Sequence, residues 1–287
     1  MRQGGKMLTF SHDQADPATI CAELLSGGGA VKITGLFSED QISEARQIII
    51  AESDAAAETV THFQGAAMEE GTANLQRRVW NLLAKGDVFS EMAAHPVIMK
   101  VLRHWLGTEF IMGSIAANRL LPGGPGQEPH VDYPYWDFHA SETHPLGLNA
   151  SFPMNAQVTI LLDPFTMESG ATAYAPGTQT ELRYPSEAEQ KAFFDTCARM
   201  TGEPGDTVIF FGAAWHCAMP NKADHDRTGV LINYLPKWVK PLEDMPSALS
   251  QAFIGEASDD IRQLLGLNYP YPENLDAAAA VNAAGRK

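Results

Sequence analysis

The spacing of apolar residues separates an N-terminal part with helical periodicity from a later part made of short apolar runs. Before Gly107, one apolar run at residues 30–35 (AVKITG) predicts a strand. Apolar residues recur every three or four positions in the segment after Ser38, over residues 73–85, and from Pro96 onward. This spacing predicts three helices, the last of which ends at Gly107.

Two of these helices carry start signals. Ser38 and Gln41 stand in the two positions of a capping box, in which each side chain bonds the backbone N–H of the other residue. Pro96 suits the first turn of a helix, because an N–H at that position would have no intrahelical partner. Both helices are therefore expected to begin at these residues.

The sequence after Gly107 has a residue pattern typical of a β-protein. Five segments are rich in β-branched or aromatic residues and are separated by clusters of Gly, Pro, Asn and Asp; they cover residues 109–122, 155–163, 170–176, 206–212 and 227–235. A helix with a capping signal at Ser186 and Glu189 interrupts them. Helices followed by antiparallel strands predict an α+β chain with a mainly β core, arranged as a sandwich or barrel.

The composition fits one folded unit. The chain has 287 residues, is 45% hydrophobic, and contains 24 Gly and 18 Pro, which favours a turn-rich β interior. We expect a single domain over 1–287, with its core at about 30–240 and a helical extension at 241–287 whose end, from residue 275, is a frayed helix or disordered. The sequence has no long apolar run that predicts a membrane span and no secretory signal, and its three widely spaced cysteines favour a reducing cytoplasm.

The net charge restricts the partners. A formal charge of −15 repels polyanions, and no basic run compensates for it. We therefore expect no nucleic-acid partner, and we favour a small metabolite or natural-product intermediate over an acyl-CoA as the substrate. The oligomeric state is left open, since a monomer and a homodimer both fit the sequence.

The segment PHVDYPYW (129–136) suggests a metal site. Residues two apart on a strand project to the same face, so His130 and Asp132 can point at one ion. A hydrogen-bonded His–Asp pair at the end of a strand would give the same pattern. A third ligand elsewhere in the chain has to decide between the two interpretations.

His216 is the best candidate for that ligand. It follows the apolar strand at 206–212 and lies between Trp215 and Cys217, whereas the other histidines stand in polar, helical or loop contexts. It is either a core histidine or a ligand. Two imidazoles and one carboxylate on one side of an ion leave other positions open, as in the non-haem Fe(II) oxygenases.

Arg227 opens the apolar segment 227–235, eleven residues after His216. Arginine at the start of a strand usually faces solvent. Here we expect its strand to be antiparallel to the one that carries His216. That arrangement would direct the planar guanidinium into the same cavity, where it suits a carboxylate.

These residues give the chain a family resemblance. The order His130-x-Asp132, His216, Arg227 resembles the triad and downstream arginine of the phytanoyl-CoA dioxygenase-like family of Fe(II)- and 2-oxoglutarate-dependent oxygenases. Three surrounding segments resemble that family too: NRLLPGGPGQEPHVD (118–132), ESGATAYAPGTQT (168–180) and GDTVIFFGAAWH (205–216). The resemblance covers about residues 30 to 240. Ser169 and Gln179 stand where the family usually has Asn and His. Neither residue belongs to the presumed metal ligands, so these departures bear on the subfamily and not on the expected chemistry.

The resemblance implies a double-stranded β-helix, a squashed antiparallel barrel of the jelly-roll or cupin type with helices on one sheet. It implies that the HxD…H triad binds Fe(II) and that Arg227 binds the distal carboxylate of 2-oxoglutarate. Gln127, Thr172 and Asn118 are further candidates for contact with this cosubstrate. The implied reaction uses O2, converts 2-oxoglutarate to succinate and CO2, and oxidises a C–H bond of the substrate. Asp132 favours hydroxylation or a related oxidation over halogenation, because halogenating relatives have a small residue there.

The substrate is indicated only broadly. Aromatic residues flank the presumed ligands, and an aromatic mouth suits an apolar or ring-bearing small molecule; they are Tyr133, Tyr135, Trp136, Phe138 and Trp215. Arg78 and Arg119 could bind a substrate carboxylate. Two other functions remain open: a zinc-type hydrolase that uses the same trio, and a cupin-like binding protein without turnover.

Overall fold

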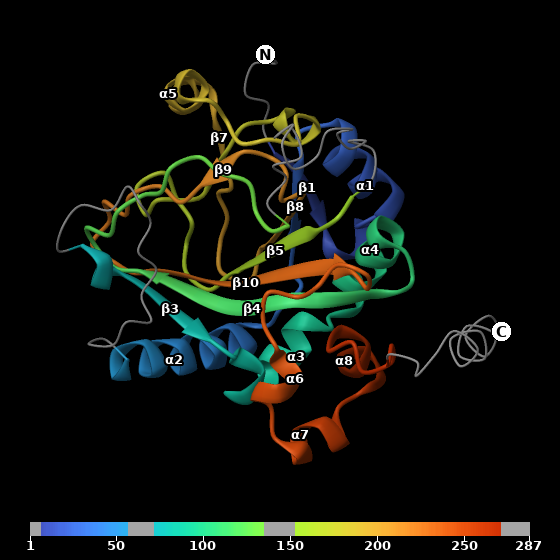
Figure 1. Ribbon diagram of the computed structural model, residues 1–287. Coiled ribbons are helices and arrows are strands. Elements are labelled where there is room, and N and C mark those ends of the chain that lie inside the picture. Colours follow the sequence, from blue (N-terminus) through green and yellow to red (C-terminus); the bar gives the residue numbers. More distant parts are fainter. Residues whose placement is uncertain (1–6, 57–71, 135–152, 271–287) are drawn as a thin grey trace.

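A computed structural model describes residues 7–56, 72–134 and 153–270 (Figure 1). Its largest element is a seven-stranded sheet in the order β1-β2-β8-β5-β10-β4-β3. The bounds of these strands are β1 Leu8–Ser11, β2 Ala30–Thr34, β3 Gln76–Trp80, β4 Phe110–Leu120, β5 Ala156–Leu161, β8 Thr207–Phe210 and β10 Arg227–Pro236. Only β1 and β2 are parallel among these pairs, and every other pair is antiparallel.

A smaller sheet has the order β7-β6-β9, with bounds β6 Ala173–Tyr174, β7 Ala198–Arg199 and β9 His216–Cys217. An isolated antiparallel bridge between His130 and His216 extends it. The small sheet lies above the long strands β4 and β10 in Figure 1, and residues of both sheets line one cavity. The two layers form the predicted double-stranded β-helix.

The described helices are α1 Pro17–Ser26, α2 Glu39–Ala55, α3 Asp87–Ala93, α4 Pro96–Leu106, α5 Glu187–Thr196, α6 Met245–Ala248, α7 Gln251–Glu256 and α8 Asp259–Leu264. The short 3-10 helices are η1 His12–Gln14, η2 Ala73–Leu75, η3 Leu82–Ala84 and η4 Thr178–Thr180. Helices α2, α4 and α8 contact strands of the large sheet, whereas α5 lies beside the small one (Figure 1). Helices therefore cover one sheet, as predicted. None of the helices in the described ranges is long and apolar enough to span a membrane.

The predicted helix starts are confirmed. Ser38 and Gln41 form a capping box at the start of α2, and Ser186 and Glu189 form another at the start of α5. Pro96 is the first residue of α4. These signals are local, so they act in the same way whatever the rest of the chain does.

The helix predicted at residues 73–85 is wrong. Strand β3 occupies the middle of this segment and is flanked by the 3-10 helices η2 and η3. The strand pairs with β4 over five positions, from Gln76 opposite Leu120 to Trp80 opposite Ala116. Backbone hydrogen bonds to β4 outweigh the helical spacing of the apolar residues, which is a weak preference that tertiary contacts often override.

The strands that carry His216 and Arg227 are not paired with each other. Arg227 opens β10 in the large sheet, between β4 and β5, whereas His216 opens β9 in the small sheet. The two residues approach the same cavity from opposite layers. A sandwich brings inward-facing residues of both sheets together across the core, so direct strand pairing is not required.

Aromatic residues join the helices to the large sheet. The Trp105 ring of α4 meets Phe211 edge-on at 5.2 Å, and its indole N–H donates to the backbone oxygen of Asn155 at 2.8 Å. The buried hydroxyl of Tyr234 in β10 donates to the oxygen of Ala93 at 2.7 Å. These contacts bury apolar rings and still satisfy their polar atoms, so β10 is held against a rigid helical layer.

Candidate active site

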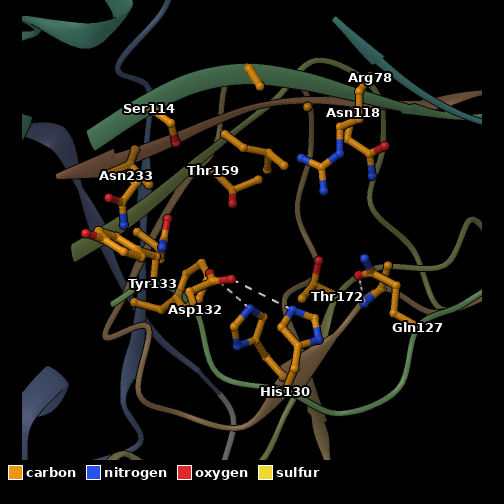
Figure 2. A pocket seen from close by; sticks show the side chains of 18 of the residues that line it. Arg78, Ser114, Asn118, Gln127, His130, Asp132, Tyr133, Thr159, Thr172 and Asn233 are labelled. Atoms are coloured by element: carbon orange, nitrogen blue, oxygen red, sulfur yellow. Dashed lines mark hydrogen bonds and ion pairs between the residues drawn. The ribbon is translucent and has the colours of Figure 1, made fainter. Parts of the chain in front are cut away.

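A cavity of about 470 Å³ lies between the two sheets. Its floor consists of side chains from β3, β4, β5 and β10, and its opposite wall carries His130, Asp132 and His216. Figure 2 shows these two walls, with the imidazoles and the carboxylate directed toward the open space between them. The predicted triad therefore faces a cavity of the size that small ligands occupy.

The three predicted ligands converge. Their potential donor atoms all lie within 4.8 Å of one another. The Nε2 atom of His216 is 3.2 Å from one oxygen of Asp132, and the Nε2 atom of His130 is 3.8 Å from the other. Each Nδ1 atom lies 2.8 Å from a backbone oxygen, that of Glu128 for His130 and that of Ala214 for His216. These bonds fix the ring orientations and leave both Nε2 atoms for an ion.

The backbone holds the triad in place without a regular strand at residues 130–132. His130 and His216 exchange two backbone hydrogen bonds, of 2.9 and 3.0 Å. The N–H of Asp132 donates to the oxygen of Gly212 at 2.8 Å. The buried Asn155 amide then ties both segments together, because it donates to the oxygen of Tyr133 at 2.6 Å and accepts from the N–H of Gly212 at 3.0 Å.

Electrostatics favour the ligand forms of two of these groups. Burial and the neighbouring His216 lower the pKa of His130 to about 4. Burial alone would raise the pKa of Asp132, but the two histidines outweigh it and hold that pKa below its usual range. For His216, burial is outweighed by the carboxylate of Asp132, which raises the pKa. A neutral imidazole and a carboxylate suit a divalent ion, so the donor set fits Fe(II).

Arg227 is a buried cation that faces the same cavity. With an exposed fraction of 3%, Arg227 is one of the least exposed charged residues of the described structure. One terminal nitrogen donates to the oxygen of Gly170 at 2.5 Å, and the guanidinium lies 4.8 Å over the ring of Phe165. Its Nε atom has no hydrogen-bond partner among the described residues, and no salt bridge to it occurs there. Burial, with Arg78 and Arg199 nearby, lowers its pKa to about 9. An anionic ligand would compensate this charge.

Comparison with known proteins agrees with this geometry. The family model of phytanoyl-CoA dioxygenase (PhyH) matches residues 26–229, which is most of the chain. The chain belongs to the PhyH family. Among curated relatives, dioxygenase lolE1 of Epichloe uncinata is 27% identical over 57% of this chain and 62% of its own length. Dioxygenase FrzG of Cladobotryum sp is 22% identical over 85% of this chain and 83% of its own length.

Four of the curated relatives are matched over only 44% to 62% of their length. A solved structure, the non-heme alpha ketoglutarate dependent epimerase SnoN from nogalamycin biosynthesis, superposes with a TM-score of 0.55 at 16% identity. That superposition covers 77% of this PhyH chain and 82% of SnoN. At this identity the likeness establishes the shared fold.

The other predicted cosubstrate residues line the cavity of this PhyH protein. Asn118 of β4 lies opposite Gly229, two positions from Arg227 along β10, and its Oδ1 atom is buried without a partner among the described residues. The Gln127 side chain accepts from the N–H of Ala218 at 3.1 Å, and Thr172 also lines the cavity (Figure 2). The fold therefore brings all three to the cavity that holds the triad.

The predicted substrate residues divide into three groups. Arg78 and Tyr133 line the cavity, and the Tyr133 hydroxyl donates to the oxygen of Lys240 at 2.5 Å. Tyr135 and Trp136 lie outside the described residues. Trp215 does not line the cavity, because its indole N–H points away and donates to the oxygen of Arg183 at 2.7 Å.

Arg119 is likewise directed away from the cavity. It binds Asp226 at 2.6 Å and Asp54 at 2.7 Å, so its charge is already compensated by two carboxylates. Neighbouring positions on a strand face opposite ways, which explains why Asn118 lines the cavity and Arg119 does not. The expectation that Arg119 could bind a substrate is therefore not supported.

Sequence reasoning missed one end of the cavity. Several polar side chains line it and were not predicted: Ser114, Gln157, Thr159, Asn233 and Glu243. The sequence contained a signal for all of them except Glu243, because each of the other four is a polar residue inside a segment whose other residues predict a buried strand. A polar residue in such a strand needs a partner, and a ligand is one possible partner.

Proposed function

We propose that this protein is an Fe(II)- and 2-oxoglutarate-dependent dioxygenase that oxidises a C–H bond of a small organic molecule. The observation that carries the proposal is that the His130–Asp132–His216 triad and the buried Arg227, which forms no salt bridge with any described residue, face each other across one cavity. Membership of the PhyH family and relatives named as dioxygenases support it.

In this proposal each wall of the cavity has its own role. The three side chains of the triad would hold Fe(II), and they all come from one wall of the cavity, so other ligands could reach the ion from the cavity. Arg227 binds the distal carboxylate of 2-oxoglutarate, and Asn118, Gln127 and Thr172 contact the same molecule. The bound iron and 2-oxoglutarate supply the oxidising chemistry, in which O2 is consumed and succinate and CO2 are formed.

The residues of this chain then position the reactants. Low polarity around Arg227 strengthens its attraction to a carboxylate, because fewer water molecules screen the charge. The Asn155 amide keeps the loop with Asp132 at a fixed distance from Gly212, and so keeps the carboxylate oriented toward His216. Arg78, which lines the cavity and lies near Asp132, is the candidate for binding a polar group of the substrate.

The rival functions make different use of these residues. A zinc-type hydrolase needs the triad and gives Arg227 no task, so a buried cation would be retained at a cost in stability. A cupin-like protein without turnover would tolerate loss of a ligand or of the arginine, and both are present. Arg227 therefore favours the dioxygenase. We also propose a cytoplasmic location and treat the chain as one oxygenase unit that acts on a small molecule, with no nucleic-acid partner.

The proposal is tested by spectroscopy on the purified protein. Addition of 2-oxoglutarate to the Fe(II)-loaded protein without O2 should give a weak visible charge-transfer band, and admission of O2 with a suitable substrate should give succinate. Zn(II)-supported hydrolysis of a substrate panel would favour the hydrolase. Neither a band nor succinate with a broad panel would favour the protein without turnover.

A further inference from the structure

The end of the cavity away from Arg227 carries a row of polar side chains. In the register of the large sheet, Asn233 of β10 lies opposite Ser114 of β4 on one side and opposite Gln157 of β5 on the other. All three line the cavity. Figure 2 shows Ser114 and Asn233 on the side away from Arg78, above Tyr133. A polar row at this place in a buried sheet indicates a recognition surface.

Asn233 is the least satisfied member of the row. It is 4% exposed, and both its amide oxygen and its amide nitrogen are buried without a hydrogen-bond partner among the described residues. A buried amide without partners costs on the order of 1–3 kcal/mol for each unsatisfied group. Such a residue is best explained by a partner that a bound ligand supplies.

A β-bulge presents this asparagine. The register of β4 and β10 shifts between Asn233 and Tyr234, which lie opposite Ser114 and Met112, so Gly113 is the extra residue. A Cβ atom on Gly113 would lie 2.1 Å from the Asn233 Oδ1 atom. A larger residue at position 113 would therefore require the Asn233 amide to move, and bulges commonly redirect side chains beside active sites.

The same bulge anchors a second polar residue. The oxygen of Gly113 accepts from the N–H of Leu242 at 3.2 Å and from the N–H of Glu243 at 3.3 Å. This anchor brings the segment after β10 back over the sheet, and both of its residues line the cavity. The Oε1 atom of Glu243 is buried without a hydrogen-bond partner among the described residues. The backbone N–H of Glu243 and the side-chain amide of Asn233 thus both lie beside Gly113, and both residues line the cavity.

The carboxyl group of Glu243 lacks compensation by a cation in the described structure. Burial is the only cause that raises its pKa, to about 7, so neighbouring charges contribute little. The other charged or titratable side chains that line the cavity come from several elements; they are Arg78 of β3, Arg227 of β10, Tyr133, and the triad of His130, Asp132 and His216. The two arginines lie toward the opposite end of the cavity, where the proposed cosubstrate binds.

We infer that Glu243 and Asn233 form a second substrate-recognition site, separate from the polar contact proposed for Arg78, and that it binds the protonated amine of a small, amine-bearing substrate. The inference rests on the proposed function, because it assigns the cosubstrate to the Arg227 end. A carboxylate with a free buried oxygen is compensated best by a cationic donor, and the Asn233 oxygen can accept a second N–H of the same ammonium group. Trp80 and Leu242, both lining the cavity and exposed, offer an apolar rim to the rest of the molecule.

Two probes of equal size test the inference. They are 2-phenylethylamine and the neutral 2-phenylethanol. Each is titrated calorimetrically into the anaerobic complex of the protein with Fe(II) and 2-oxoglutarate at about pH 8. At this pH the Glu243 carboxyl group is mostly ionised and an amine with a pKa of about 10 is protonated. The amine should bind roughly tenfold or more tightly than the alcohol. Its affinity should fall as the pH is lowered through about 7, because the Glu243 carboxylate becomes protonated.

Three variants complete the experiment. Glu243→Gln should remove the preference for the amine and its pH dependence, and Asn233→Ser should weaken amine binding. Glu256→Gln, an equal charge change on exposed α7, should leave both unchanged. In each variant the charge-transfer band with 2-oxoglutarate reports the proposed function separately. Three results, each with an intact band, would overturn the inference and leave the dioxygenase proposal standing. They are equal binding of both probes, binding of neither probe at millimolar concentration, and retention of the preference for the amine in Glu243→Gln.

Discussion

The replacement Arg227→Met separates a ligand-binding arginine from a structural one. Methionine keeps an unbranched side chain of similar reach and removes the charge. If Arg227 is retained for 2-oxoglutarate, the ligand-free protein should not need it, since the cation is buried with one backbone bond and no carboxylate among the described residues. We therefore expect affinity and stability to change in opposite directions.

The magnitudes follow from the surroundings of the guanidinium. Burial, together with repulsion from Arg78 and Arg199, lowers its pKa from 12.5 to about 9, which at about 1.36 kcal/mol per pKa unit corresponds to a cost on the order of 5 kcal/mol for the charged form. The bond to Gly170 returns roughly 1.5–3 kcal/mol and the contact with Phe165 about 0.5–2 kcal/mol. The ligand-free variant should therefore be as stable as the parent or more stable, by up to about 3 kcal/mol.

Two measurements check this prediction. Thermal unfolding without ligand should show an equal or higher midpoint for Arg227→Met. Anaerobic titration of the charge-transfer band should show roughly tenfold to hundredfold weaker binding of 2-oxoglutarate, the loss expected for one or two charge-assisted hydrogen bonds. Arg199→Met is the matched control, because Arg199 is half-buried and also bonds a backbone oxygen but does not line the cavity. The control should lose much less affinity for 2-oxoglutarate than Arg227→Met, because Arg199 is close enough to lower the pKa of Arg227 but does not line the cavity.

The opposite pattern would refute the reasoning. A variant that loses several kcal/mol of stability without ligand, yet binds 2-oxoglutarate normally, would show that Arg227 supports the fold. Equal losses of affinity in Arg227→Met and Arg199→Met would show a general electrostatic effect in place of a specific contact.

Three further predictions concern the residues around the cavity. His216→Ala should abolish Fe(II) binding measured by dialysis and metal analysis, while exposed His225→Ala should keep it; retention of iron in His216→Ala would contradict the triad. Asn155→Ala should lower the unfolding free energy by about 1–3 kcal/mol for each backbone group left unpaired, and weaker Fe(II) binding should accompany the loss. Gly113→Ala should cost about 1–3 kcal/mol in denaturant unfolding, because its Cβ would meet the Asn233 oxygen; an unchanged midpoint would contradict the close approach.

The sequence was sufficient for the metal-binding wall of the site. His130, Asp132 and His216 are marked by spacing and by their order along the chain, and the structure brings them together. The strands around them are predicted for the same reason, since their β-branched and aromatic content is a local property. Capping at Ser38 and Ser186 is local as well.

The floor of the cavity depends on pairing between distant segments, which spacing does not reveal. Strand β3 has the apolar period of a helix and becomes a strand only by pairing with β4, which changes the position of Arg78 from a helix surface to a cavity wall. Glu243 reaches the cavity because of a bulge at Gly113, 130 positions earlier. Neither outcome follows from the sequence around the residue itself.

Strand β10 carries both ends of the cavity, with Arg227 at its first position and Asn233 six residues later. At about 3.4 Å per residue the two positions lie roughly 20 Å apart along a nearly inextensible backbone. The strand therefore sets a fixed distance between the two ends of the cavity. A five-carbon diacid held at one end takes less than half of that span, so the remainder suits a molecule of one or two rings, and any longer tail has to pass between Trp80 and Leu242 into solvent.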